Sequence, residues 1–241
     1  MEFHARLESP LGRILLCSRG TGLAGLYFVG QKDCPSVPGV RPPQHASPAA
    51  GDLNGRPIRS LHARRRALEP DLFGEENLAR TAGNQACMRY ARQTLSKTAG
   101  GGANTGQDDQ AGTLELLQAD TPLNVQDIFA QAGAELGEYF EGSRRVFSVP
   151  LQLDGTPFQQ RVWQALLGIP YGEYVSYGDV AVAAGMTRHH GRPVGAAVGQ
   201  NPVTIIVPCH RVLASSGQLN GYSSGLERKV ALLELEGFEV G

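Results

Sequence analysis

The chain has 241 residues, of which 41% are hydrophobic, and its formal net charge is −1. This length is sufficient for an ordinary buried core, and the near-neutral charge excludes an overall electrostatic attraction to nucleic acids or membranes. No stretch approaches the roughly 18 apolar residues of a membrane span, and the first residues lack the pattern of a signal peptide. We therefore expect a soluble, cytoplasmic monomer, or a nuclear one if the source is eukaryotic.

The cysteines give no sign of a metal site or of disulfide bonds. Cys17, Cys34, Cys87 and Cys209 are widely spaced and form no Cys-x-x-Cys pair. This spacing argues against a zinc ribbon and a disulfide framework, and it favours a reducing compartment. The sequence predicts no cofactor and no metal.

The chain begins with short apolar runs separated by turns that contain glycine and proline. Residues 3–7, 13–18 and 23–29 are three such runs, which predicts a meander of strands. Residues 31–119 then differ in character, with many prolines and three consecutive glycines. We expect this segment to be a long, largely disordered insertion. Short helical turns around residues 72–92 stay an alternative within it.

Regular structure is expected to resume after the insertion. Apolar residues at helical spacing predict a helix over residues 123–140, which Gly142 ends. Alternating apolar and polar residues predict a strand over residues 146–153 that completes the N-terminal sheet. These elements together indicate an N-terminal α/β domain over residues 1–153.

Residues 154–241 are expected to form a second, helical domain. Thr156 and Pro157 are typical of a helix start, and Ser176 is the N-cap of a second helix that stops at Gly185. A third helix of small residues is predicted over residues 193–199. Two short helices joined by a tight turn resemble a helix-turn-helix, and a helix of Gly, Ala and Val suits a narrow minor groove.

The last predicted helix covers residues 226–236. Its apolar positions are expected to face inward, with Arg228 and Lys229 exposed. The residues expected on the buried face are Leu226, Val230, Leu233 and Leu235.

The candidate nucleophile follows an apolar run. Residues 205–207 predict a short buried strand, and Pro208 stops it so that Cys209 stands at the strand end. A free thiol with a pKa near 8.5 is only about 3% thiolate at neutral pH, so a base must take its proton. The adjacent His210 points to the opposite face of an extended chain, which leaves a bridging water or a reverse turn as alternatives.

A third group must orient the imidazole of His210. Glu236, at the end of the last helix, is the natural candidate, although spacing alone does not select it over Glu234. The alternative for Cys209 is a buried, inert thiol, which the polar neighbours His210 and Arg211 disfavour.

The residues from Pro208 to Val212 resemble a known family. The run Pro208, Cys209, His210, Arg211, Val212, with the neighbouring motifs at 158–163, 169–173, 201–202, 221–223 and 232–237, is similar to the O6-alkylguanine-DNA alkyltransferases. The resemblance covers residues 156–237, and the N-terminal strands are similar to the ribonuclease-H-like domain of that family. It implies an α+β fold in which such a domain precedes a helical domain with a helix-turn-helix.

The resemblance also implies a reaction. Double-stranded DNA would bind through its minor groove, a damaged guanine would flip out of the helix, and its O6-alkyl group would move irreversibly to Cys209. O4-methylthymine would be a second substrate, and no obligate protein partner or membrane would be involved. The single-use acceptor makes the protein a stoichiometric reagent.

Further roles are carried over from the family residue by residue. The resemblance makes Cys209 the acceptor, His210 a base that acts through water, and Glu236 the partner of His210. Asn201 would brace the active-site turn. In DNA binding, Arg192 would fill the gap left by the flipped base and Tyr177 would crowd the 3′ phosphate, while the base pocket would contain Val212, Tyr222 and Ser223.

Two departures from the family pattern affect these expectations. Ser224 stands where a small glycine is common, which predicts a narrower pocket, and Pro193 follows Arg192 in place of the usual alanine. Two other functions compete with repair: a non-catalytic or regulatory protein that binds alkylguanine in DNA, and a cysteine hydrolase that turns over repeatedly.

Overall fold

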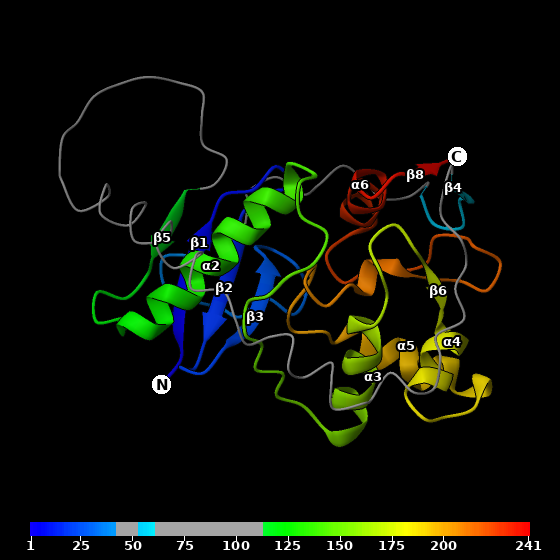
Figure 1. Ribbon diagram of the computed structural model, residues 1–241, viewed down its shortest axis with the longest axis horizontal. Coiled ribbons are helices and arrows are strands. Elements are labelled where there is room, and N and C mark those ends of the chain that lie inside the picture. Colours follow the sequence, from blue (N-terminus) through cyan, green and yellow to red (C-terminus); the bar gives the residue numbers. More distant parts are fainter. Residues whose placement is uncertain (42–52, 61–112) are drawn as a thin grey trace. The chain divides into compact units, whose positions relative to one another are not determined.

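The computed structural model describes residues 1–41, 53–60 and 113–241. Five α-helices and eight short strands lie within these residues, so the fold is mixed α/β (Figure 1). The chain forms two compact units, one of Met1–Leu26 with Leu78–Gln152 and the other of Tyr27–Asn77 with Leu153–Gly241. The division into functional domains at residues 153 and 154 stays a prediction.

A four-stranded sheet is the centre of the first unit. Its strand order is β3-β2-β1-β5, and β1 pairs antiparallel with both β2 and β5. The helix α2 packs against β1, β2 and β5 and buries its apolar face on them. The bounds are β1 Phe3–Leu7, β2 Ile14–Ser18, β3 Leu23–Phe28, β5 Leu114–Leu116 and α2 Leu123–Phe140. The predicted meander and the predicted helix are therefore confirmed.

The strand predicted over residues 146–153 is wrong. Only Leu151 forms a bridge, which is parallel and joins Leu23. The backbone donors of Ser148 and Val149 are bonded to the buried carboxylate of Glu135 instead, at 2.8 and 3.2 Å, and the following residue is a proline without a donor. A buried carboxylate thus takes the bonds that a sheet neighbour would have taken.

The expected insertion at residues 31–119 contains regular structure in two of its described parts, 53–60 and 113–119. β4 (Ile58–Ser60) pairs antiparallel with the C-terminal strand β8 (Phe238–Val240), and β5 belongs to the sheet of the first unit. The prediction of disorder is wrong for these strands, because partners far away in the sequence supply their hydrogen bonds. The helical turns expected near residues 72–92 lie outside the described residues.

The helices of the second unit begin as their capping residues predict. Thr156 caps α3 (Pro157–Leu167) and Ser176 caps α4 (Tyr177–Ala183), each in a reciprocal capping box with the residue three positions later. Val162, Trp163, Ala165 and Leu166 of α3 are buried, while Leu167 at the end of the helix is 37% exposed. The indole of Trp163 donates a hydrogen bond to the carbonyl of Ala197 at 2.9 Å, which joins α3 to α5.

The helix of small residues, α5 (Gly191–Gly199), begins two residues earlier than predicted, after the 3₁₀ turn η3 (Arg188–His190). α5 packs against both α3 and α4. Gly191 and Gly195 of this helix face Tyr177, and a methyl group at Gly195 would make an ordinary contact with the tyrosine ring, at 3.6 Å. No helix in the described parts of the chain is long and apolar enough to span a membrane.

The C-terminal helix α6 (Leu226–Leu235) differs from the prediction at Lys229, which is buried rather than exposed. Lys229 is three residues after Leu226 and four before Leu233, so helical spacing places it on the buried face with both. The two-stranded pairs β4-β8 and β6-β7 complete the second unit. β6 is Val175–Ser176 and β7 is Val212–Leu213.

Candidate active site

The thiol of Cys209 is held by a tight turn and not by a strand end. Residues 205–207 form a turn in which Ile205 has a φ of 74°, so the strand predicted there is wrong. The apolar side chains of this run are all buried, and burial rather than strand pairing accounts for them. Cys209 then opens the 3₁₀ helix η4 (Cys209–Arg211), which gives the reverse turn that was one of two expected alternatives.

Asn201 fastens this turn from inside. Its side-chain amide donates to the carbonyl of Val207 at 2.8 Å and to the sulfur of Cys209 at 3.1 Å. Its carbonyl oxygen accepts from the backbone N–H of Val203 at 3.0 Å. One buried amide thus bonds both ends of the turn and the thiol itself.

His210 and Glu236 are brought together, as the sequence suggested. The Nε2 atom of His210 lies 2.9 Å from Glu236 Oε1, and both side chains are fully buried. Because a carboxylate only accepts, Nε2 carries the proton of a neutral imidazole, and Nδ1 carries the lone pair. Nδ1 is buried and has no hydrogen-bond partner among the described residues. Glu234, the other candidate, is exposed.

Arg211 is the second partner of Glu236. Its guanidinium binds the carboxylate through Nε at 2.9 Å and Nη2 at 2.8 Å, and its Nη1 donates to the carbonyl of Ile169 at 2.6 Å. The carboxylate also accepts from the backbone N–H of Gly172 at 3.1 Å. From the sequence, Arg211 is expected only as a polar neighbour of Cys209; its role depends on Glu236, 25 positions away.

The charges of this network favour a neutral histidine and an ionised glutamate. Burial lowers the pKa of His210, and the nearby Glu236 offsets this only in part. Burial alone would raise the pKa of Glu236, but the hydrogen bond from His210 and the charge and hydrogen bonds of Arg211 outweigh it and hold that pKa well below 4.5. Because the imidazole is neutral at pH 7, the permanent countercharge is Arg211.

The thiol needs help to ionise. Burial raises the pKa of Cys209, while the hydrogen bond from Asn201, the charge of Lys229 and the hydroxyl of Tyr222 lower it in part. Lys229 is 1% exposed, and its ammonium donates to the carbonyls of Val212 at 2.7 Å and Asn220 at 3.0 Å. Burial lowers the pKa of Lys229 to about 8, against the opposing effect of Cys209. Lys229 was expected to be exposed, but its helical spacing from Leu226 and Leu233 could have predicted its burial.

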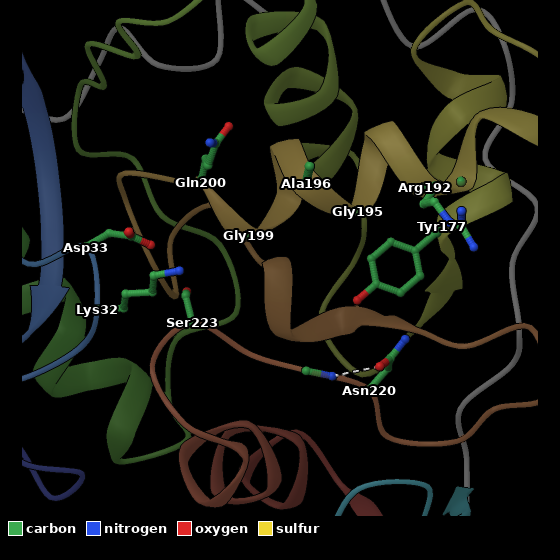
Figure 2. Close-up of a pocket in the computed structure, with 12 residues that line it drawn as sticks. Lys32, Asp33, Tyr177, Arg192, Gly195, Ala196, Gly199, Gln200, Asn220 and Ser223 are labelled. Atoms are coloured by element: carbon green, nitrogen blue, oxygen red, sulfur yellow. Dashed lines mark hydrogen bonds between the residues drawn. The ribbon is translucent and has the colours of Figure 1, made fainter.

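The other predicted site residues fall in two places. Tyr177, Arg192 and Ser223 line an open cavity of about 620 Å³, which Figure 2 shows beside the small-residue face of α5. Val212 is buried in β7, where its carbonyl binds Lys229, and it does not line this cavity. Burial, and next the charge of Cys209, raise the pKa of Tyr177 to about 12, so its hydroxyl keeps its proton.

The sequence of this chain is similar to those of known proteins. The family model described as "6-O-methylguanine DNA methyltransferase, DNA binding domain" matches residues 157–238. A "Methylated-DNA--protein-cysteine methyltransferase" of Mycobacterium leprae is 55% identical over 112 residues, which are 46% of this chain and 67% of the relative. The constitutive protein of that name from Bacillus subtilis is 51% identical over 131 residues, 54% of this chain and 78% of the relative.

The chain belongs to the methylated-DNA–protein-cysteine methyltransferase family. The resemblance inferred from Cys209 and its neighbours is confirmed. A crystal structure of Mycobacterium tuberculosis OGT in complex with DNA is also similar, with a TM-score of 0.55 and 31% identity over 96% of this chain and 91% of that chain. Membership in the methyltransferase family and the buried network around Cys209 both point to chemistry at this thiol.

Proposed function

We propose that this protein repairs DNA by transferring an alkyl group from O6 of guanine to Cys209, once per molecule. The observation that carries the proposal is the thiol itself, which is bonded to Asn201, lies near the charge of Lys229 and precedes the His210–Glu236 pair. A merely structural cysteine needs none of these groups. The non-catalytic alternative is disfavoured because the acceptor thiol is present with its supporting residues.

The reaction proceeds by displacement at the alkyl carbon. A bond forms between that carbon and Sγ, the bond from the carbon to O6 breaks, and the electron pair stays on guanine. The thiol proton passes to Nδ1 of His210, through water where the two do not touch, and Glu236 stabilises the imidazolium that forms. The resulting thioether has no labile proton, so the acceptor is not regenerated.

The departing guanine gains charge that a proton donor would stabilise. The hydroxyl of Tyr177, whose pKa is raised to about 12, is protonated near neutral pH and can stabilise this charge by donating a hydrogen bond. The hydroxyl of Tyr222 also lies close to the thiol. O4-methylthymine presents a similar alkyl ether and belongs to the same substrate class.

For DNA binding we propose that α4 and α5 act as a helix-turn-helix in the minor groove. Arg192 is exposed in the first turn of α5 and lines the cavity together with Tyr177. A guanidinium in this position can occupy the gap left by a flipped nucleotide and recover part of the stacking energy. Residues 154–241 would then carry binding and catalysis, and the N-terminal domain would have the ribonuclease-H-like fold.

Intact-mass measurement tests the reaction. Wild-type protein incubated with duplex DNA that contains O6-methylguanine is expected to gain the mass of one methyl group, on a peptide that includes Cys209. The Cys209→Ala variant should bind the same DNA without a mass gain. A hydrolase would release product continuously without a stable mass change, and wild-type protein that binds this DNA but gains no mass would refute alkyl transfer.

A further inference from the structure

A turn outside the C-terminal helical region is fixed to the loop beside the cavity. Gln31 is 7% exposed, and its side-chain oxygen accepts from the backbone of Phe28 at 2.9 Å and from the hydroxyl of Ser224 at 2.7 Å. The backbone of Gln31 bonds to Phe28 and Cys34, which closes two successive turns. Lys32 and Asp33, which lie within the second of these turns, are therefore held at a fixed position.

A second contact strengthens the attachment. The guanidinium of Arg228 lies over the ring of Phe28, 4.5 Å from its centroid, and donates to the carbonyl of Ser224 at 2.7 Å. Ser224 was expected to narrow the pocket, and this prediction is wrong. Its hydroxyl binds Gln31, and Ser223 lines the cavity instead. Ser224 is a tether between two segments that are 193 positions apart.

The tethered turn places a cation at the cavity. Lys32 and Asp33 line one side of the cavity, and Figure 2 shows Lys32 beside Ser223, opposite the α5 face that carries Arg192. Both residues are exposed, and neither side chain makes a hydrogen bond or ion pair within the described part of the chain. The ammonium of Lys32 is thus available to a ligand, and the tether limits the backbone entropy that this turn loses on binding.

We propose that Lys32 binds a backbone phosphate of the substrate DNA and so adds a contact from outside the helical region. DNA placed along the small-residue face of α5 would present its backbone to the opposite side of the cavity. A lysine ammonium binds phosphate as a point charge. The carboxylate of the neighbouring Asp33 repels phosphate, so the turn attracts phosphate only close to the ammonium of Lys32. This inference rests on the proposed DNA-repair function.

One phosphate contact has a measurable signature in the salt dependence of binding. Each neutralised phosphate contributes a slope of about −0.9 to the plot of log affinity against log salt, which amounts to roughly 5-fold in affinity at 0.15 M salt. Lys32→Ala should therefore weaken binding by about that factor and make the slope shallower by about one. The loss should be equal for methylated and unmethylated duplexes, because phosphate contacts carry no base information.

The variants separate this contact from a folding defect and from loss of charge in general. Lys32→Arg should keep the wild-type slope, and Arg161→Ala, which removes an exposed cation of α3 that does not line the cavity, should also keep it. Reaction of Lys32→Ala with a free O6-alkylguanine base, which has no phosphate, should proceed at the wild-type rate. Ser224→Gly should reproduce part of the loss, and adding it to Lys32→Ala should cause little more.

The outcomes are distinct. Wild-type protein that takes no methyl group from DNA would remove the proposed function itself. Normal repair by the wild type together with an unchanged slope in Lys32→Ala would overturn only the phosphate contact, as would an equal change in Arg161→Ala. Fully additive losses from Ser224→Gly and Lys32→Ala would show that the tether does not act through Lys32.

Discussion

Replacing Glu236 by Gln keeps the shape of the side chain but removes the charge that His210 and Arg211 share. The buried guanidinium of Arg211, bound through two nitrogens in the native protein, loses its countercharge. Removing one partner of a buried ion pair costs about 3–5 kcal/mol. At about 2–4 °C for each kcal/mol in a protein of this size, the melting temperature should fall on the order of 10 °C.

The same substitution should slow alkyl transfer for a separate reason. An amide group can donate to Nε2 of His210, which would place the imidazole proton on Nδ1 and remove the lone pair that accepts the thiol proton. A general base contributes roughly 10²–10⁴ to a rate, so a loss within that range is expected. Single-turnover methyl transfer from duplex DNA, followed by quenching and mass measurement, gives this rate.

The double variant Arg211→Met/Glu236→Gln separates the two effects. It removes both charges, so most of the lost stability should return, while the slow transfer should persist because His210 still lacks its carboxylate. Transfer by Glu236→Gln at the wild-type rate, measured well below its melting temperature, would refute the assigned role of Glu236. Recovery of the rate in the double variant would show that misfolding, not the state of His210, caused the loss.

The pH dependence of stability provides a check on the same residue. The pKa of Glu236 is held below 4.5 in the folded protein, so its contribution to stability is present above pH 4.5 and is lost as the pH falls below that value. The lowered pKa of His210 acts in the same direction below pH 6.5. Because Glu236 also raises the pKa of His210, Glu236→Gln should lose stability at least as steeply as the wild type between pH 6.5 and 5 in urea unfolding, where Glu236 itself does not titrate.

Two further predictions concern the surroundings of the thiol. Lys229→Met removes a charge that favours the thiolate, so transfer should slow by about tenfold. Between pH 8 and 10.5 the unfolded chain binds one more proton than the folded protein, because the folded pKa of Lys229 is about 8. Urea unfolding should therefore show that the wild type gains stability over this pH range and that the variant does not. Methylation of Cys209, 3% exposed and 3.1 Å from the amide of Asn201, should destabilise the protein by about 1–3 kcal/mol; calorimetry that finds equal melting temperatures before and after reaction would contradict this.

Local signals predicted the elements whose causes are local. Thr156 and Ser176 fix helix starts because each cap bonds to a backbone group three residues away, and Gly142 and Gly185, both at positive φ, follow the ends of α2 and α4. The strands expected over residues 146–153 and 205–207 failed for the opposite reason. Their backbone donors are claimed by side chains or turns, Glu135 in the first case, which apolar alternation does not reveal.

The residues of the candidate site also differ in whether a local sequence pattern could predict them. The motif around Cys209 predicted a nucleophile, a base and an acid partner, and the structure brings His210 and Glu236 together; the family resemblance carries the order of these residues along the chain. The residues that the sequence missed act over long separations: Arg211 binds Glu236 25 positions away, and Gln31 binds Ser224 193 positions away. Pairs of this kind depend on how the chain returns to the site, and composition around Gln31 indicated only an insertion.

The turn before Cys209 affects both the stability of the protein and the consequence of alkylating the thiol. A β-branched residue with positive φ, such as Ile205 at 74°, costs on the order of 1–3 kcal/mol, and the burial of its neighbours offsets this cost. In return, the turn places the sulfur against the amide of Asn201, which also bonds Val207. An alkyl group on the sulfur would push against this same amide, so the group that prepares the thiol for reaction is also the first to be displaced by its product.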